Sequence, residues 1–114
     1  MIVATAPFIA GQRVVETKGQ TFGVVVRSRG LAGNFVAGLR SLVGGEIHEY
    51  TQLLEDTRRQ ALDRLVQNAT VMGANAVISM RFDSSEMASY MTEIVAYGTA
   101  VVIEPDASAP QAHE

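Results

Sequence analysis

Apolar residues recur along this chain at two different spacings, and the spacings predict its secondary structure. From Gln12 to Arg27 the sequence is rich in β-branched residues, which are typical of a strand. Gly19 and Gly23 within this run mark either a hairpin turn or bulges in one long bent strand. We favour a strand that is interrupted near Lys18-Gly19.

The longest regular pattern has helical spacing and runs from Glu46 to Met72. Its apolar positions lie three or four residues apart and form one stripe: Ile47, Tyr50, Leu54, Ala61, Leu65, Ala69 and Met72. Gly73 is predicted to end the helix in the left-handed conformation. Arg58 interrupts the stripe, so its charge must pair, reach the rim or cross a subunit boundary. Candidate partners for it are Asp83, Glu86 and Glu93.

The remaining elements are shorter. We expect a first strand at Ile2–Ala6, a short helix from Asn34 to Gly44-Gly45, a buried strand at Asn75–Arg81, a polar turn at Asp83–Glu86, and a last strand at Thr92–Ile103 with a bulge at Gly98. The sequence therefore predicts an α+β fold with a mainly antiparallel sheet, one short helix and one long helix. Residues 1–104 form a single compact domain in this interpretation, and residues 105–114 form a disordered Pro/Ala-rich tail.

Composition changes the picture in two ways. Only 18% of the 114 residues are charged, where about 25% is typical, and a small domain with so little charge is expected to bury surface against other copies of itself. The net charge of −3 and the single lysine argue against nucleic-acid binding and against a polybasic membrane anchor. The N-terminus lacks a basic signal-peptide region, and no apolar run approaches bilayer length. We expect a soluble cytoplasmic protein.

The residues available for chemistry are few. The chain has no cysteine, which excludes disulfides, thiolate nucleophiles and thiolate metal sites. Its two histidines, His48 and His113, serve no recognisable catalytic triad. Gly73 follows a helix and precedes a strand, which is the wrong order for a dinucleotide-binding turn. Gly30 and Gly33 precede a helix but lack the rest of such a motif, so a glycine-rich turn is the simpler interpretation.

One group of side chains suits a metal ion. Glu46, His48 and Glu49 lie together at the start of the long helix, and carboxylates with an imidazole suit Mn, Ni, Zn or Co ions. Glu46 and Glu49 share a helix face, but His48 does not lie three or four residues from either. Acidic residues in a first turn also complement the helix dipole. A divalent metal is the only cofactor that the sequence suggests.

The order of several motifs resembles a known family. Phe35-Val-Ala-Gly-Leu-Arg40, Val43-Gly-Gly45, Gly73-Ala-Asn-Ala-Val77 and Gly98-Thr-Ala-Val101, together with Tyr50 and Asp83, are similar to the YbjQ-like family of bacterial and archaeal proteins. That family is often labelled heavy-metal-binding. The resemblance covers the chain from about Ile2 to Ile103. It implies an α+β fold assembled into a ring-shaped homopentamer, without an established activity.

Three functional hypotheses follow. The first is a non-enzymatic oligomeric binding or scaffold protein, with any ligand at subunit interfaces near Arg40, Gly44, Gly45, Tyr50 and Arg58. In a ring, one Glu46 per chain becomes a ring of carboxylates that can bind a cation. The alternative is an enzyme that acts on a small polar or phosphorylated metabolite with Asp83, Glu93 and Arg58. The third is a purely structural partner of another protein.

Overall fold

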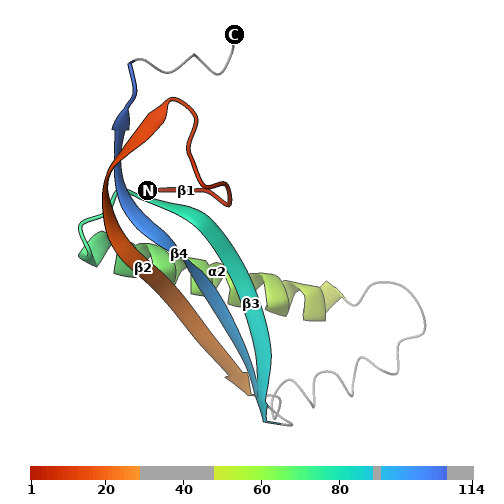
Figure 1. Cartoon of the computed structure of the whole chain (residues 1–114). Coiled ribbons are helices and arrows are strands. Elements are labelled where there is room, and N and C mark those ends of the chain that lie inside the picture. Colours follow the sequence, from red (N-terminus) through yellow and green to blue (C-terminus); the bar gives the residue numbers. More distant parts are fainter. Residues whose placement is uncertain (29–47, 89–90, 108–114) are drawn as a thin grey trace.

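One long helix and one mixed sheet make up the part of the chain that the computed structural model describes, residues 1–28, 48–88 and 91–107. The elements in chain order are β1 (Ile2–Val3), β2 (Gln12–Ser28), α2 (His48–Val71), β3 (Ala76–Ala88) and β4 (Met91–Pro105). The strands lie in the order β1-β3-β4-β2, as Figure 1 shows. β1 is parallel to β3, and the other two strand pairs are antiparallel. This confirms the α+β class and the mainly antiparallel sheet.

Some expected features lie outside the described residues. The predicted short helix from Asn34 to Gly44-Gly45 is one of them, and most of the predicted tail is another. The first residues of that tail are described, because β4 continues to Pro105 and the amide of Asp106 donates a hydrogen bond to the Gly11 carbonyl at 2.9 Å.

β2 is one continuous strand with bulges, one of the two alternatives left open by its glycines, and it is irregular but not interrupted near the predicted position, Lys18-Gly19. Its pairing with β4 shifts between Val14 and Glu16 and again between Thr17 and Gly19, so the strand contains two bulges. Gly19 has a φ of 124°, a conformation that side chains disfavour. The 17 residues of β2 span about 56 Å at the usual rise per strand residue. The 24 residues of α2 span only about 36 Å, so the helix covers part of the sheet.

The predicted polar turn at Asp83–Glu86 is wrong. β3 continues through all four residues, and Asp83, Ser84, Ser85 and Glu86 pair with Val95, Ile94, Glu93 and Thr92 of β4. All four residues are exposed, so their polarity reflects contact with water and not a change of chain direction. Backbone pairing with β4, a long and mainly apolar strand, outweighs the low strand propensity of Asp and Ser.

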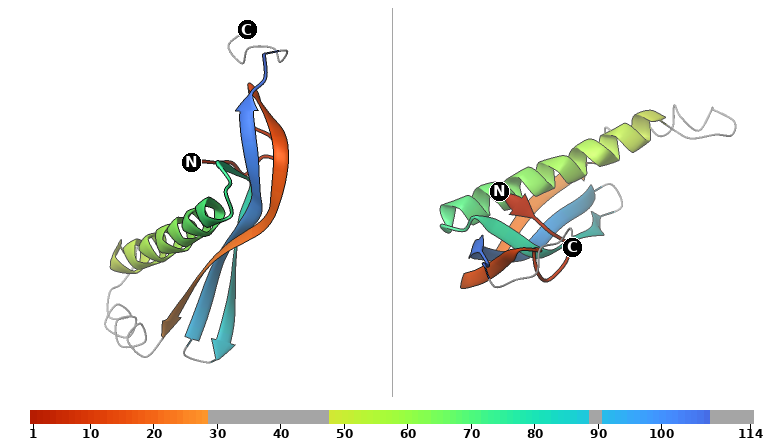
Figure 2. Two further views of the ribbon diagram at one scale, coloured as in Figure 1. Left: turned by 90° about the vertical axis from the view of Figure 1, so that its left-hand side faces the viewer. Right: turned by 90° about the horizontal axis from the view of Figure 1, so that it is seen from above.

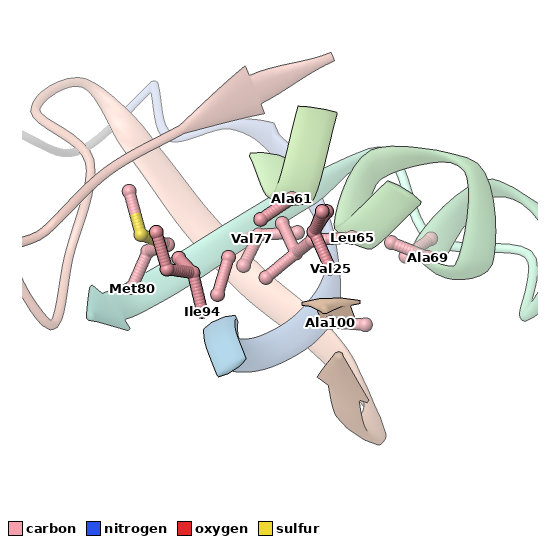
Figure 3. Packing of buried hydrophobic residues seen from close by; sticks show 10 residues of the cluster. Val25, Ala61, Leu65, Ala69, Val77, Met80, Ile94 and Ala100 are labelled. Atoms are coloured by element: carbon pink, nitrogen blue, oxygen red, sulfur yellow. The ribbon is translucent and has the colours of Figure 1, made fainter. Parts of the chain in front are cut away.

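The core lies between α2 and one face of the sheet. Alternate residues of β2 and β4 point toward the helix, and Val25, Ile94 and Ala100 belong to one buried cluster with Ala61 and Leu65 of α2 (Figure 3). The helix comes so close to β2 that a Cβ added to Gly23 would lie 1.9 Å from the carbonyl oxygen of Ala61. Absence of a side chain at Gly23 therefore sets the distance between helix and sheet.

The buried stripe of α2 differs from the predicted one at one turn. Thr57, which is 1% exposed, occupies the buried position between Leu53 and Ala61, whereas Arg58 and Leu54 are exposed. The Thr57 hydroxyl donates to the Leu53 carbonyl at 2.8 Å and accepts a hydrogen bond from Arg27 Nε at 3.2 Å. Arg58 therefore lies beside the buried stripe and does not interrupt it.

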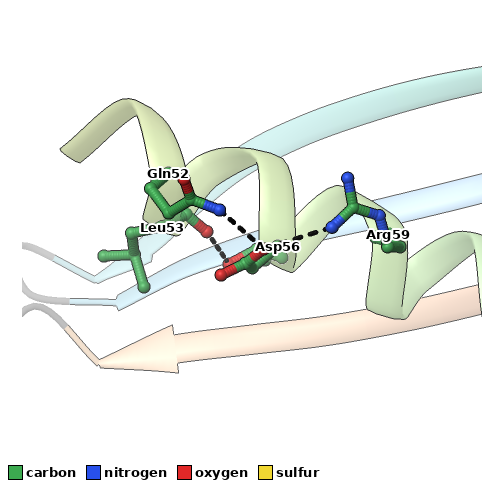
Figure 4. Close-up of polar contacts among 5 residues, drawn as sticks. Gln52, Leu53, Asp56 and Arg59 are labelled. Carbon is green, nitrogen blue, oxygen red and sulfur yellow. Dashed lines mark hydrogen bonds and ion pairs between the residues drawn. The ribbon is translucent and has the colours of Figure 1, made fainter. Parts of the chain in front are cut away.

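The exposed face of α2 carries its own polar pairs. Gln52 Nε2 donates to Asp56 Oδ1 and Arg59 pairs with the same oxygen, both at 3.4 Å (Figure 4). Side-chain pairs three or four residues apart stabilise an isolated helix by about 0.3 kcal/mol per pair.

The chain leaves α2 through the Gly-Ala-Asn-Ala-Val motif. Gly73 has a φ of 86°, and its amide and that of Ala74 donate to the carbonyls of Thr70 and Ala69, which confirms the predicted helix end. Asn75 then extends the sheet with its side chain. Its Nδ2 donates to the Ile103 carbonyl at 3.0 Å, and its Oδ1 accepts from the Ile103 amide at 2.7 Å. This pair aligns the start of β3 with β4.

Candidate functional site

The sheet has a second face that no described helix covers, which we call the open face. In both views of Figure 2, α2 stands on the opposite side of the sheet. Because paired residues of an antiparallel ladder point to the same side, the register assigns the open face its side chains. They are Phe22, Val24 and Val26 of β2, Glu93, Val95, Tyr97 and Thr99 of β4, and Arg81, Asp83 and Ser85 of β3.

The open face is apolar along β2. Phe22, Val24 and Val26 are 47%, 38% and 44% exposed, and Tyr97 beside them is 38% exposed. On the helix-facing side of the same strand, Thr21, Gly23 and Val25 are buried. The strand therefore directs its smaller residues inward and several of its larger apolar residues outward, which is the reverse of the usual arrangement for a monomer.

A hollow of about 200 Å³ interrupts the open face where β3 bulges. Its lining comes from three strands: Gln20, Phe22, Ser79, Tyr97, Gly98 and Thr99. Phe22 lies directly opposite Tyr97 in the ladder, and Gln20 lies opposite Thr99 on the next rung of the same face. Two aromatic rings thus stand beside two polar side chains, with Ser79 approaching from β3.

The bulge itself is strained and closely held. Ser79 has a φ of 54°, the one positive value among the described residues other than glycine. The extra residue of β3 lies opposite Gly98, where an added Cβ would come within 2.8 Å of Val77. The predicted bulge at Gly98 is therefore real, but the extra residue belongs to the neighbouring strand. Amides of Ser79 and Met80 donate to Ala6 and Ala4, so the N-terminal segment holds this conformation.

The outer edge of β2 is closed by side chains of the helix. Asn68 Nδ2 donates to the Phe22 carbonyl at 2.6 Å, and Arg64 Nη1 donates to the Val24 carbonyl at 2.5 Å. These carbonyls would otherwise offer hydrogen-bond acceptors to another strand. At Phe22 and Val24, the edge of β2 therefore offers no free carbonyl to another strand.

Most of the predicted interface residues cannot be placed. Arg40, Gly44, Gly45 and Glu46 lie outside the described residues. His48, Glu49 and Tyr50 occupy the first turn of α2, but the positions of their side chains are outside the description. Arg58 is the exception: its guanidinium carbon lies 5.3 Å from the centre of the Phe82 ring, a cation–π contact at the rim of the core.

The residues proposed for an enzyme do not meet in one chain. Asp83 and Glu93 both lie on the open face, one rung apart on neighbouring strands. Arg58 stands over Phe82, which packs against the core from the helix side of the sheet. The sheet therefore separates the arginine from both carboxylates, so these three described residues do not line one common cleft.

The described residues of one chain do not fit a metal site either. Among residues 1–28, 48–88 and 91–107, no three side chains of the His, Cys, Asp or Glu type come together. The whole chain lacks cysteine, the ligand that soft heavy metals prefer. A metal site built from Glu46, His48 and Glu49 stays a prediction.

Comparison with known proteins shows where the chain belongs. A family model, YbjQ, described as "Putative heavy-metal-binding", matches residues 1–104. The chain belongs to the YbjQ family. The match confirms the resemblance that the motifs indicated, over nearly the whole sequence.

Individual members of the YbjQ family are similar in sequence over almost their full length. The UPF0145 protein of Bradyrhizobium sp. (strain ORS 278) is 69% identical over 105 residues, which are 92% of this chain and 95% of the relative. An archaeal relative, the UPF0145 protein of Methanoregula boonei, is 59% identical over 109 residues, covering 96% and 91% of the two chains.

A solved structure shares the fold. It is a protein of unknown function of the DUF74 family from Pediococcus pentosaceus, with a TM-score of 0.61, 15% sequence identity, and coverage of 91% of this chain and 98% of that one. At this identity the likeness shows the fold alone. In the described part of the YbjQ chain, no helix is long and apolar enough to cross a membrane.

Sequence reasoning missed the hollow and the open face. The signal in the sequence is limited to Thr21-Phe22-Gly23-Val24, where a polar and a small residue alternate with larger apolar ones. The run Val24-Val25-Val26 that follows does not alternate, so it does not indicate which of these residues are exposed. No local pattern indicates that Ser79 faces Gly98, because that contact depends on the register between two strands.

Proposed function

We propose that this YbjQ protein is a non-enzymatic binding or scaffold module whose copies associate, with its ligand bound where copies meet. The observation that carries the proposal is the open face of the sheet. Contiguous exposed apolar side chains are rare on monomeric proteins and commonly mark a binding surface. Here they lie along one strand, at Phe22, Val24 and Val26, with Tyr97 on the next strand.

Two further features support association through this face. Asn68 and Arg64 bind two carbonyls on the outer edge of β2, which disfavours edge-to-edge pairing with another chain there. The low proportion of charged residues, 18%, also favours buried surface between copies. A ring-shaped homopentamer is the assembly that the family resemblance implies.

The family description makes a divalent metal the first ligand class to test. Among the described residues of one chain no cluster of donors is found, and the site that we propose takes one donor, Glu46, from each copy. Equilibrium dialysis of the protein with Zn²⁺, Ni²⁺, Co²⁺ and Mn²⁺ would measure bound metal per chain. Equal binding by wild type and Glu46→Ala would remove Glu46 as the ligand.

The association is tested by mass. We expect multi-angle light scattering to give a mass several times that of one chain for the wild type. Val24→Glu places a charge in the centre of the open face and is expected to lower the mass, because a buried unpaired carboxylate is costly. Val71→Glu is the matched control, since Val71 is 87% exposed at the end of α2 and away from the sheet. A monomeric wild type would overturn the proposal.

A further inference from the structure

We propose that the hollow at the Ser79 bulge binds a small uncharged molecule with a flat ring face and with hydroxyl or amide groups at its rim. A sugar ring and a nucleobase both have this chemistry. The inference rests on the proposed function and adds a second ligand class beside the metal ion. Phe22 and Tyr97 belong both to the hollow and to the face through which we propose that copies associate, so the bound molecule would lie where copies meet. The hollow itself is formed by one chain and does not need a neighbouring copy to exist.

The aromatic side of the hollow suits a ring. Phe22 and Tyr97 lie on the same rung of the ladder and on the same face of the sheet. They are 47% and 38% exposed, so substantial parts of both rings face solvent. A flat ligand that contacts such rings buries apolar surface at little cost in side-chain freedom, since an aromatic side chain has only two rotatable bonds.

The polar side of the hollow supplies hydrogen bonds. Gln20, Ser79 and Thr99 present an amide and two hydroxyl groups, and Tyr97 adds a phenol. Among the described residues, none of these four side chains makes a hydrogen bond to another part of the protein. Their donors and acceptors are therefore free to bind a ligand or water.

The charge of the lining defines the ligand further. None of the six lining residues is ionisable at neutral pH. Arg81, opposite Tyr97 on β3, is the charged neighbour, and its Nη1 already donates to the carbonyls of Thr5 at 2.7 Å and Met80 at 2.9 Å. A metal ion would find no anionic side chain in this lining, and Arg81 is already bonded to two backbone carbonyls, so a neutral ligand is favoured.

The strain at Ser79 points to the same site. A bulge residue with positive φ is usually glycine, because a side chain there costs about 1 kcal/mol (about fivefold in an equilibrium constant). Serine at this position is therefore less stable than glycine would be, but it places a hydroxyl group at the hollow. Backbone strain of this kind concentrates at functional sites.

The test is a ligand-detected NMR titration of the full chain with two probes, methyl β-glucoside and uracil. A hollow of about 200 Å³ holds few ligand atoms, so we expect one of the probes to bind with a dissociation constant in the millimolar range. Binding of the glucoside alone identifies the ring as a sugar, and binding of uracil alone identifies it as a base. Inorganic phosphate is the charged control and is expected not to bind.

Two variants and a matched control connect binding to the hollow. Ser79→Gly removes the hydroxyl and accepts the positive φ, and Thr99→Val removes a hydroxyl while keeping the shape. Each is expected to weaken binding about fivefold through the loss of one hydrogen bond. Both should melt within a few degrees of the wild type, because neither disturbs the backbone. Ser85→Ala, on the same face but outside the hollow, is expected to bind as the wild type does.

Light scattering on the same samples separates this inference from the proposed association. If the wild type is associated but binds neither probe at a probe concentration about ten times the expected dissociation constant, the association stands and the hollow is overturned as a site. Equal binding by the wild type and both hydroxyl variants overturns it as well. A monomer that binds a probe and loses binding in the variants supports the hollow and overturns the association.

Discussion

A missing side chain at Gly23 determines how closely α2 lies on the sheet. An added Cβ would lie 1.9 Å from the Ala61 carbonyl oxygen and 2.6 Å from the Leu65 amide nitrogen. Both contacts are to backbone atoms, which cannot rotate away as a side chain can. The adjacent hydroxyl of Thr21 donates to the Leu65 carbonyl at 2.9 Å, so helix and strand are also joined by a buried hydrogen bond.

We therefore expect Gly23→Ala to lower the free energy of unfolding by about 2 to 3 kcal/mol, because the helix must move outward to admit one methyl group. Urea denaturation followed by circular dichroism measures the change. Gly11→Ala is the control, since an added Cβ there meets nothing within 4 Å and adds only the strain of a φ of 76°. That control is expected to lose about 1 kcal/mol. Equal losses in the two variants would contradict the close approach at Gly23.

Asn75 has a comparably specific role. Its side-chain amide takes the place of a strand residue by bonding both the amide and the carbonyl of Ile103. An aspartate has almost the same shape but cannot donate, and its negative oxygen would face the Ile103 carbonyl. We expect Asn75→Asp to lower the free energy of unfolding by about 1 kcal/mol, because one hydrogen bond is lost at an exposed position. Urea melts of Asn75→Asp and of Asn68→Asp, which loses one donor to β2, provide the comparison. A tolerated Asn75→Asp would show that the pair contributes little.

At the level of elements, β2 combines an open face with a closed edge. Asn68 and Arg64 bind the carbonyls of Phe22 and Val24, so two consecutive outward-facing acceptors are already used. Natural sheets commonly protect an edge strand from pairing with another chain, and side chains of the helix do so here.

Removal of this cover has a predictable result. The double variant Arg64→Ala/Asn68→Ala is expected to remain folded but to form thioflavin-binding aggregates several-fold faster than the wild type on mild heating. Arg59→Ala is the matched control, because Arg59 lies on the exposed side of the same helix and contacts only Asp56 among the interactions of the described chain. If the double variant aggregates no faster than this control, the edge is protected by something other than these two side chains.

Sequence patterns predicted the elements well where one pattern dominated. The long helix and the last strand were each recognisable from spacing or composition, and the structure confirms them. The strand character of β2 was recognisable too, but its continuity through Lys18-Gly19 was not. The polar half of β3 was not recognisable, since Asp83–Glu86 has the composition of a turn and becomes a strand only through its pairing with β4. Burial of Thr57 was not predictable either. The residues around Thr57 in the sequence do not show whether it is buried and bonded to Arg27 or exposed to water.

The hollow depends on still more distant relations. Gln20, Ser79 and Thr99 come from three strands, and they meet only because a bulge in β3 is placed opposite Gly98. The strained conformation of Ser79 is held by hydrogen bonds from residues 79 and 80 to Ala6 and Ala4 near the N-terminus. Neither the strand register nor these contacts can be predicted from short stretches of sequence. The residues that line the hollow are therefore identified only from the structure.

At the level of the whole molecule, the core is thin. In the part of the chain that the structure describes, six of the twelve buried apolar residues are alanines, namely Ala61, Ala69, Ala74, Ala76, Ala96 and Ala100. Larger apolar side chains such as Phe22, Val24 and Val26 are exposed instead. Burial of an alanine removes little apolar surface from water, so the described part of one chain gains modest hydrophobic stabilisation by itself. Association through the open face would supply the missing burial.

The stability of the protein should therefore depend on its concentration. Association stabilises the folded chain by mass action, and a tenfold rise in concentration adds about 1.4 kcal/mol per association step. For a domain of this size that increase raises the Tm by roughly 5 °C. We expect scanning calorimetry across a hundredfold range of concentration to give a rising Tm for the wild type and for Val71→Glu, and a nearly constant, lower Tm for Val24→Glu. Wild-type melting that is independent of concentration, combined with a monomeric mass, would mean that one chain is stable with its open face in water. In that case the apolar residues along β2 would belong to a surface for a different partner.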